Sequence, residues 1–111
     1  MRQKQEQLLY EIEKYLDYLV VVEGKRDKAA LERLGFKNIF ILNSDGKSMG
    51  EKIEEIEKEA KNREISILTD FDVKGRKLFE KLNSELSQRN VKLDRKLRSR
   101  LKKEVTFIED L

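Results

Sequence analysis

Short apolar runs alternate along this chain with longer stretches in which apolar residues recur at helical spacing. The apolar runs lie at residues 19–22, 38–42 and 65–69. Runs of this length that are rich in Val, Ile and Leu are typical of strands buried on both faces. The helical stretches lie at residues 28–34, 49–61 and 73–88. Strands that alternate with helices predict an α/β fold, with a compact, mainly parallel sheet and helices on both faces.

The two ends of the chain complete this prediction. Residues 1–18 have an amphipathic pattern and predict an N-terminal helix, so the compact domain is expected to span residues 19–111. Near the other end, we expect a helix at about residues 94–103 and the fourth strand at residues 105–108. Glu109 and Asp110 follow, and we expect them to belong to a frayed tail.

The composition removes several classes of chemistry. The chain has no His and no Cys, which excludes His-based catalysis, thiolate zinc sites and disulfides. No apolar run reaches the roughly 18 residues of a membrane-spanning helix, and there is no signal-peptide pattern. We therefore expect a soluble, cytoplasmic protein without a membrane partner. Abundant Lys and Glu without Cys is also typical of proteins from thermophiles.

An acidic pair directly follows the third apolar run. Asp70 and Asp72 are two residues apart, so an extended backbone places both carboxylates on the same side. At the carboxyl end of a strand in an open α/β sheet, they would face the crevice in which such sheets bind ligands. Carboxylate oxygens suit a hard divalent cation, Mg2+ or its substitute Mn2+. The alternative is a polar loop whose acids only favour the N-terminus of the following helix.

A second acidic motif ends the first apolar run. Glu23 and Gly24 follow the strand, and Lys25, Arg26 and Asp27 lead into the next helix. A carboxylate, a glycine that permits a sharp turn and cations at a helix entrance are suited to work on a phosphate. The simpler interpretation is an ordinary turn, with Asp27 serving only as the helix N-cap.

The two acidic motifs become more specific when they are considered together. If Glu23 cooperates with Asp70 and Asp72, the first and third strands must be neighbours in a doubly wound sheet. Right-handed connections would then place the first crossover helix on one face and the later helices on the other. Carboxylates gathered at one sheet edge repel each other, because a like charge within ~4–6 Å raises the pKa of its neighbour. A bound cation removes this conflict.

The same motifs resemble those of the Toprim domain. The resemblance rests on the strand-terminal Glu23-Gly24, on Asp70-Phe71-Asp72 and on the trailing Gly75-Arg76, and it extends from about residue 19 to residue 107. The Toprim family includes bacterial-type primases, type IA and type II topoisomerases, OLD-family nucleases, recombination proteins and the ribonuclease that matures 5S rRNA. The stretch VVVEGKRD followed by AALERLG is most similar to small stand-alone members and to that ribonuclease branch.

The resemblance implies a Rossmann-like sheet of about four strands and a role for each motif residue. Glu23 is expected to act as the general acid or base or to bind the metal, and Asp70 and Asp72 to coordinate Mg2+. Lys25 and Arg76 are expected to contact phosphate. The chain is expected to comprise this module alone, so the reactions that primases and topoisomerases owe to other domains are not implied. The remaining motif residues are expected to support the site, and they are Gly24, Asp27 and Gly75.

A basic segment precedes the C-terminus. Residues 89–103 contain eight Lys or Arg side chains and a single acidic one, Asp94. Leu97 and Leu101 would anchor one side of the expected helix and leave the cations outward. Such a face is often only solvated surface, but beside a metal site it suits the phosphate backbone of a nucleic acid. The residues expected to make this contact are Arg95, Arg98 and Lys102.

These observations favour a Mg2+-dependent protein that acts on nucleic-acid phosphodiester bonds, with RNA preferred over DNA. On this hypothesis it is a ribonuclease-like RNA-processing nuclease, in which a metal held by Asp70 and Asp72 stabilises the phosphate and the leaving oxygen. Two alternatives stay open. The site could serve a non-catalytic module that binds nucleic acid, beside a ribosomal or other RNA–protein particle. It could also be a metal site without any nucleic-acid role.

Overall fold

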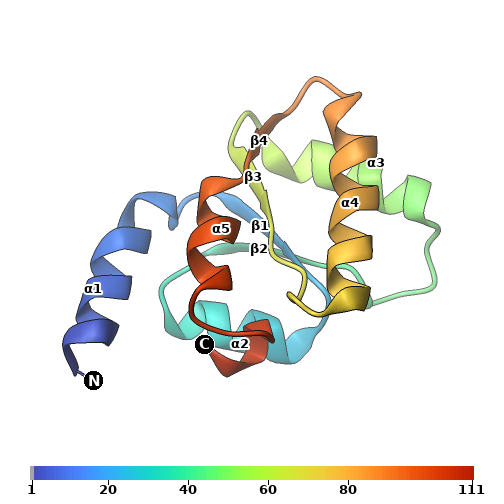
Figure 1. The fold of residues 1–111 in the computed structure, drawn as a ribbon. Helices are drawn as coiled ribbons and strands as arrows, with labels where there is room; N and C mark the ends of the chain where they lie inside the picture. Colours follow the sequence, from blue (N-terminus) through green and yellow to red (C-terminus); the bar gives the residue numbers. More distant parts are fainter. Residues whose placement is uncertain (1) are drawn as a thin grey trace.

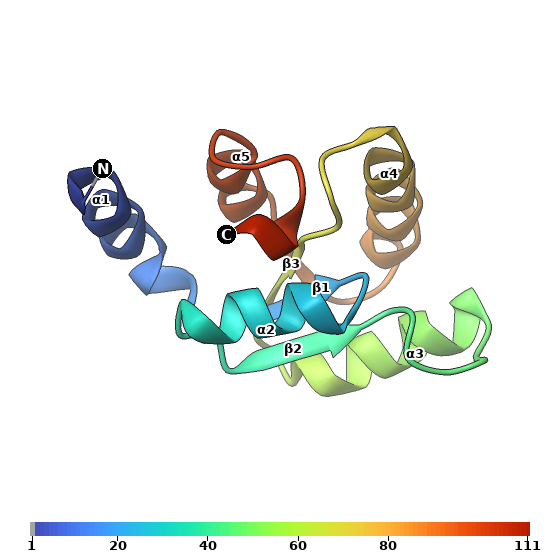
Figure 2. The ribbon, with the colours of Figure 1, turned by 90° about the horizontal axis from the view of Figure 1, so that it is seen from below.

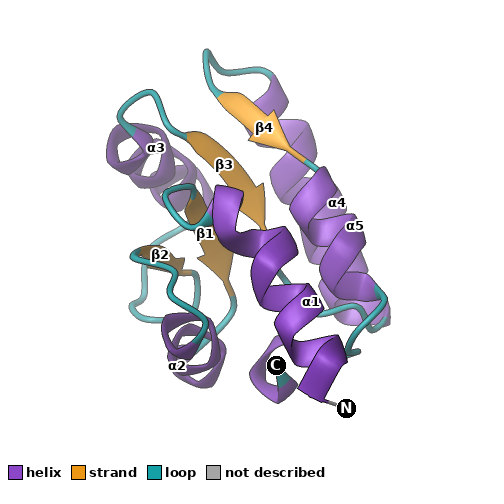
Figure 3. Ribbon diagram, turned by 90° about the vertical axis from the view of Figure 1, so that its left-hand side faces the viewer, coloured by secondary structure: helices purple, strands orange, loops and turns teal. Residues whose placement is uncertain are grey.

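Four parallel strands form a single sheet at the centre of the molecule. The computed structural model describes residues 2–111, and the strand order is β2-β1-β3-β4. Figure 3 shows the four arrows pointing the same way. The strands are β1 (Leu19–Val22), β2 (Asn38–Ile41), β3 (Glu64–Ile67) and β4 (Lys92–Asp94). The predicted α/β fold is confirmed, and so is the prediction that the first and third strands are neighbours.

Helices connect these strands and cover both faces of the sheet (Figure 2). The α-helices are α1 (Arg2–Ile12), α2 (Lys25–Arg33), α3 (Met49–Ala60), α4 (Val73–Ser87) and α5 (Lys96–Lys102). Two 3-10 helices are η1 (Glu13–Tyr15), which continues α1, and η2 (Ile108–Asp110), which lies near the C-terminus. The predicted N-terminal helix is therefore shorter than expected, because the helical path tightens after Ile12 and ends before β1.

Two hydrophobic layers follow from the alternation of side chains along the strands. Leu19 and Val21 of β1 pack in the layer that contains α3 and α4. Val20 and Val22 pack in the layer that contains α1, α2 and α5. All four side chains are buried, as a central parallel strand requires. The expectation that the later helices all cover the face opposite the first crossover helix is wrong for α5, whose apolar side chains return to the face of α2.

The fourth strand does not lie where the sequence predicted it. It is Lys92–Asp94, in which Leu93 pairs with Ile65 of β3. This edge strand is short and carries one apolar side chain between two charged ones, so it gave no continuous apolar signal. Residues 105–108 do carry such a signal, but they form a bend that leads into η2.

The C-terminal segment packs on the body of the protein. Ile108 is fully buried in the layer that contains α2, and Arg26 of α2 forms an exposed ion pair with Glu109 at 3.9 Å. Figure 1 shows this last turn beside α2. The expectation of a frayed tail is wrong, because a buried isoleucine anchors the turn.

Helix α1 projects from the rest of the molecule (Figure 1). Its attachment comes from Ile12 and from Tyr15 of η1, both of which are buried. Glu11 adds an ion pair with Arg100 of α5. No helix among residues 2–111 is long and apolar enough to cross a membrane.

Candidate metal and phosphate site

The two acidic motifs meet at the carboxyl edge of the sheet. Glu23 directly follows β1, and Asp70 lies just beyond β3. Oε2 of Glu23 accepts a hydrogen bond from the backbone N–H of Asp70 at 2.9 Å, which joins residues 47 positions apart in the sequence. The pairing of the two strands extends almost to this point, because the N–H of Leu68 donates to the carbonyl of Val21 at 2.7 Å. The structure therefore brings together the residues that the sequence proposed as partners.

Backbone donors hold the two aspartates of the second motif. Oδ1 of Asp70 accepts the N–H of Ile108 at 2.7 Å. Oδ1 of Asp72 accepts the N–H of Gly75 at 2.8 Å, which makes Asp72 the N-cap of α4. In both residues these hydrogen bonds use one oxygen, so the second oxygen remains for a ligand.

Helix α4 begins so close to Asp70 that only glycine fits at position 75. A Cβ on Gly75 would lie 2.1 Å from the carbonyl oxygen of Asp70 and 2.6 Å from its carbonyl carbon. Thr69 strengthens this contact, because its hydroxyl donates to the carbonyl of Gly75 at 2.7 Å. The sequence analysis expected Gly75 to support the site, and the structure places it in the first turn of α4. Its function is to permit close approach rather than an unusual backbone angle.

In the first acidic motif, the N-cap of α2 is not the residue that the sequence predicted. Gly24 is the N-cap of α2, and Asp27, at the third helical position, accepts the N–H of Gly24 at 3.0 Å. Asp27 is therefore not the N-cap, although it satisfies a donor at the same helix end. Gly24 is extended, with φ −145, and a Cβ there would meet nothing within 4 Å. The fold itself does not need a glycine at position 24.

The acidic edge carries more negative charge than its surroundings neutralise. Burial raises the pKa of Glu23, and the charges of Asp70, Asp27 and Asp72 raise it further, against the lowering effect of the Asp70 N–H. Burial likewise raises the pKa of Asp27, which is only 7% exposed, and the charges of Asp70 and Glu109 act in the same direction. Among the described residues, Glu23, Asp27, Asp70 and Asp72 form no salt bridge with a Lys or Arg.

The buried Arg98 is the main element of the site that sequence reasoning misplaced. Its side chain is 8% exposed, so the expectation that this cation faces outward is wrong. The guanidinium donates to the carbonyls of Ile67 at 3.1 Å, Thr69 at 2.7 Å and Asp70 at 3.2 Å. Burial lowers the pKa of Arg98 to about 10, against the opposing charges of Asp70 and Glu23. Arg98 thus remains a cation at neutral pH and holds the backbone that carries the acidic motif.

The segment before the C-terminus also holds the acidic motif, and nothing in the sequence pointed to this contact. The N–H of Phe71 donates to the carbonyl of Thr106 at 2.8 Å, beside the hydrogen bond from Ile108 to Asp70. Backbone hydrogen bonds between distant segments depend on how the chain packs and leave no local sequence pattern. Ile108 was correctly expected to be buried, but as part of a strand at residues 105–108 rather than in η2.

The carboxylates of this site are suited to bind Mg2+ through part of its coordination shell. Among residues 2–111, no three Asp or Glu side chains lie in an arrangement that would hold an ion by themselves. Mg2+ commonly binds through one or two carboxylates and completes its shell with water and substrate phosphates. Asp70 and Asp72, each with one oxygen fixed by the backbone, are suited to that partial ligation. Burial and, after it, the charges of Asp70, Asp27 and Asp72 raise the pKa of Glu23, and a cation at this edge would offset both effects.

The predicted phosphate-binding cations lie in three different places. Arg76 and Lys102 line the same small hollow between α4 and α5, beside Phe71 of the acidic motif. Lys25 is exposed in the first turn of α2. Arg95 lines a separate shallow hollow of about 320 Å³, and the other side chains that line it are Lys96, Ser99, Arg100 and Lys103.

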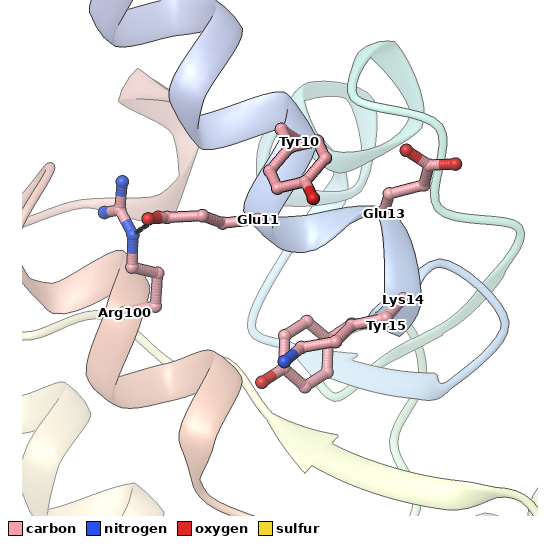
Figure 4. Close-up of a pocket in the computed structure, with 6 residues that line it drawn as sticks. All are labelled: Tyr10, Glu11, Glu13, Lys14, Tyr15 and Arg100. Atoms are coloured by element: carbon pink, nitrogen blue, oxygen red, sulfur yellow. Dashed lines mark hydrogen bonds and ion pairs between the residues drawn. The ribbon is translucent and has the colours of Figure 1, made fainter.

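A larger hollow of about 670 Å³ lies away from the carboxylates, between α1 and α5. Figure 4 shows Arg100 and Glu11 facing each other across it, with the rings of Tyr10 and Tyr15 nearby. Arg100 also pairs with Glu104 at 2.6 Å. Two acidic side chains, Glu11 and Glu13, match its two cations, and Arg100 is already engaged by Glu11 and Glu104, so this hollow has no surplus of positive charge for a phosphate.

Comparison with known proteins finds relatives that align with most of this chain and a solved structure with the same fold. A UPF0292 protein of Thermococcus sibiricus is 35% identical over 96% of this chain and 83% of its own length. The UPF0292 protein of Methanocaldococcus jannaschii is 37% identical over 71% of this chain. The matched region covers 60% of that protein's own length. A solved structure of a protein from Aquifex aeolicus has the same fold, with a TM-score of 0.77, 24% identity and 96% of each chain covered.

The family model of the Toprim domain matches residues 17–96, which include Glu23, Asp70 and Asp72. Toprim domains typically bind divalent metal ions such as Mg2+ and have roles related to nucleic acids. The matched range contains all four strands of the sheet and both acidic motifs. The chain belongs to the Toprim domain family.

Proposed function

We propose that this protein binds Mg2+ through Asp70 and Asp72, with Glu23 beside them, and acts on phosphodiester bonds of nucleic acid. The observation that carries the proposal is the hydrogen bond from the Asp70 N–H to Glu23, which places both acidic motifs at one sheet edge. These carboxylates form no salt bridge with a described Lys or Arg, and the charge of the buried Arg98 acts on Asp70 and Glu23 without pairing with either, so a divalent ion is the natural counter-charge. When bound, such an ion supplies charge stabilisation to a phosphate and its leaving oxygen.

Glu23 has the properties of a proton carrier in this chemistry. Its Oε2 is fixed by the Asp70 N–H, and its raised pKa brings proton exchange closer to neutral pH. The second oxygen, Oε1, is left to exchange a proton with a water or with the leaving oxygen. Arg76 and Lys102 are exposed and supply positive charge for the phosphate backbone.

We further propose RNA as the preferred substrate and a ribonuclease-like processing reaction in the cytoplasm. The proposal rests on the stretch between Val20 and Gly35, which resembles the motifs of small stand-alone members and of the ribonuclease branch. A second candidate is a non-catalytic module that binds nucleic acid, for example beside an RNA–protein particle. It is favoured by the absence, among the described residues, of three carboxylates already in ion-binding arrangement.

Cleavage assays with two variants test the proposed activity. Incubation of a structured RNA with Mg2+ should give cleavage by the wild type, and Asp70→Asn or Glu23→Gln should reduce the rate at least ~100-fold, the usual scale of acid–base and metal contributions. Glu32→Gln in α2 makes the same chemical change at an exposed position and should retain the rate. Unchanged cleavage in both site variants would contradict the proposal. Mg2+-dependent RNA binding without any turnover by the wild type would favour the non-catalytic module.

A further inference from the structure

A hollow of about 220 Å³ lies between α4 and α5, and we call it the α4–α5 pocket. Its lining residues are Phe71, Arg76, Phe79, Glu80, Arg98 and Lys102. We propose that this pocket takes one unpaired nucleotide of a single-stranded nucleic acid, with its phosphate at Arg76 and Lys102 and its base against the phenylalanine wall. The inference deepens the proposed function, on which it rests for its placement beside the metal site.

The pocket adjoins the carboxylates through shared residues. Phe71 stands between Asp70 and Asp72 in the sequence and forms part of the pocket wall. Arg98 also lines the pocket, and its guanidinium donates to the carbonyls of Thr69 and Asp70. A nucleotide bound here would therefore place the neighbouring phosphate of the same strand close to the acidic edge.

The charges of the pocket favour an anion. Arg76 and Lys102 are exposed and form no salt bridge with a described acidic side chain, so their charges are available to a ligand. Arg98 contributes a third positive charge from within, since its lowered pKa of about 10 still leaves it protonated. Glu80 is the one acid among the lining residues. The pocket thus carries a surplus of positive charge next to the negative edge of the sheet.

The aromatic wall favours a base over a bare phosphate. The Arg98 guanidinium lies over the rings of Phe71 and Phe79, with 4.7 and 4.4 Å from its central carbon to the ring centres, so it covers one face of each ring and leaves the uncovered parts of the rings for a base. Both rings are only half-buried and line the pocket. Aromatic rings and guanidinium planes are the surfaces on which unpaired bases stack, whereas a paired base keeps its faces inside the duplex.

A pair of charge-matched variants tests the location. Arg76→Ala with Lys102→Ala removes the two exposed pocket cations, and Lys96→Ala with Lys103→Ala removes two exposed cations outside the pocket, at the start of α5 and at its C-cap. Binding of a fluorescent single-stranded RNA, measured by anisotropy in EDTA so that no cleavage occurs, should weaken at least ~10-fold more in the pocket pair. Glu80→Gln should strengthen binding. Equal losses in the two double variants would overturn the proposal.

A second binding measurement tests whether the pocket takes a base. A strand of the same length that carries abasic sugars has the same phosphates but nothing to stack, so the wild type should bind it ~10-fold or more weakly than the normal strand. A duplex should also bind less tightly than the single strand at the same salt concentration. If the wild type binds the abasic strand as well as the normal one, the pocket takes no base and the inference is wrong.

These outcomes separate the pocket from the proposed cleavage. Loss of binding in the pocket pair, combined with a wild type that never cleaves RNA, supports the pocket and contradicts the nuclease. Cleavage that depends on Asp70, combined with equal binding losses in the two double variants, supports the nuclease and removes the pocket.

Discussion

Replacing Gly75 with Ala is expected to destabilise this protein by about 3 kcal/mol, the upper part of the range for forced overpacking. In most helices this change is stabilising by roughly 0.5–1 kcal/mol, because glycine is a poor helix former. Here the added methyl group would lie 2.1 Å from the carbonyl oxygen of Asp70, so either α4 or the acidic motif must move. Thermal unfolding should show a decrease of roughly 10 °C in the midpoint.

Gly24→Ala provides the matched control. Gly24 ends the other acidic motif, but a Cβ there has open space within 4 Å and the backbone is extended. We expect a change of less than ~1 kcal/mol, from replacing a good N-cap residue by a poor one. Equal losses of stability in the two variants would show that the tight contact between α4 and Asp70 is not what position 75 requires.

Arg98→Ala is expected to cost about 4 kcal/mol. The change leaves the carbonyls of Ile67, Thr69 and Asp70 without their guanidinium donor, and each buried unpaired group costs ~1–3 kcal/mol. It also empties the space beside Phe71 and Phe79, which adds a cavity term. Urea unfolding should detect the loss as a lower midpoint with a similar slope.

Two further variants make the Arg98 result specific. Lys102→Ala removes an exposed cation of the same helix and should change stability by no more than ~0.5 kcal/mol. Arg98→Lys keeps the charge but cannot reproduce the planar set of donors, so most of the loss should persist. Full stability in Arg98→Lys would mean that charge alone, rather than hydrogen bonding to the strand end, explains this residue.

The fold could be predicted because its evidence is local. Continuous apolar runs gave β1 and helical spacing gave α3 and α4, and the hypothesis that Glu23 and Asp70 cooperate placed β1 beside β3. The edge strand β4 was missed for the opposite reason. An edge strand needs only one apolar residue, and Leu93 between Lys92 and Asp94 is too weak a pattern to compete with residues 105–108.

The acidic residues of the site were also accessible from sequence, but their supports were not. The carboxylates could be predicted because each acidic motif directly follows an apolar run, and such a change in residue type marks the end of a strand. The buried position of Arg98 depends on which side of a short helix faces the sheet edge. Several similar cations lie in this segment, so the sequence does not show which of them is buried. The hydrogen bond from Ile108 to Asp70 joins residues 38 positions apart and involves only a backbone donor.

The raised pKa of Glu23 gives one contribution to the pH dependence of stability, and it can be isolated with a variant. The folded protein holds this proton more tightly than the unfolded chain, so the carboxyl group favours folding only while it stays protonated. This contribution is present below the ordinary glutamate pKa of ~4.3 and is lost as the pH rises through the higher folded pKa. Glu23→Gln removes the ionisation but keeps an oxygen that can accept the Asp70 N–H. Without metal, the variant should therefore gain stability over the wild type as the pH rises toward neutral.

Unfolding temperature against Mg2+ concentration, at neutral pH and starting from EDTA, tests the central claim that the crowded carboxylates hold a divalent ion. We predict that Glu23→Gln is more stable than the wild type in EDTA, that Mg2+ stabilises the wild type by about 2.7 kcal/mol at 100 times its Kd, and that Asp70→Asn, which lacks a proposed ligand, responds much less. Glu32→Gln should respond as the wild type does. Equal Mg2+ responses in the wild type and Asp70→Asn, with no gain of Glu23→Gln in EDTA, would contradict the account.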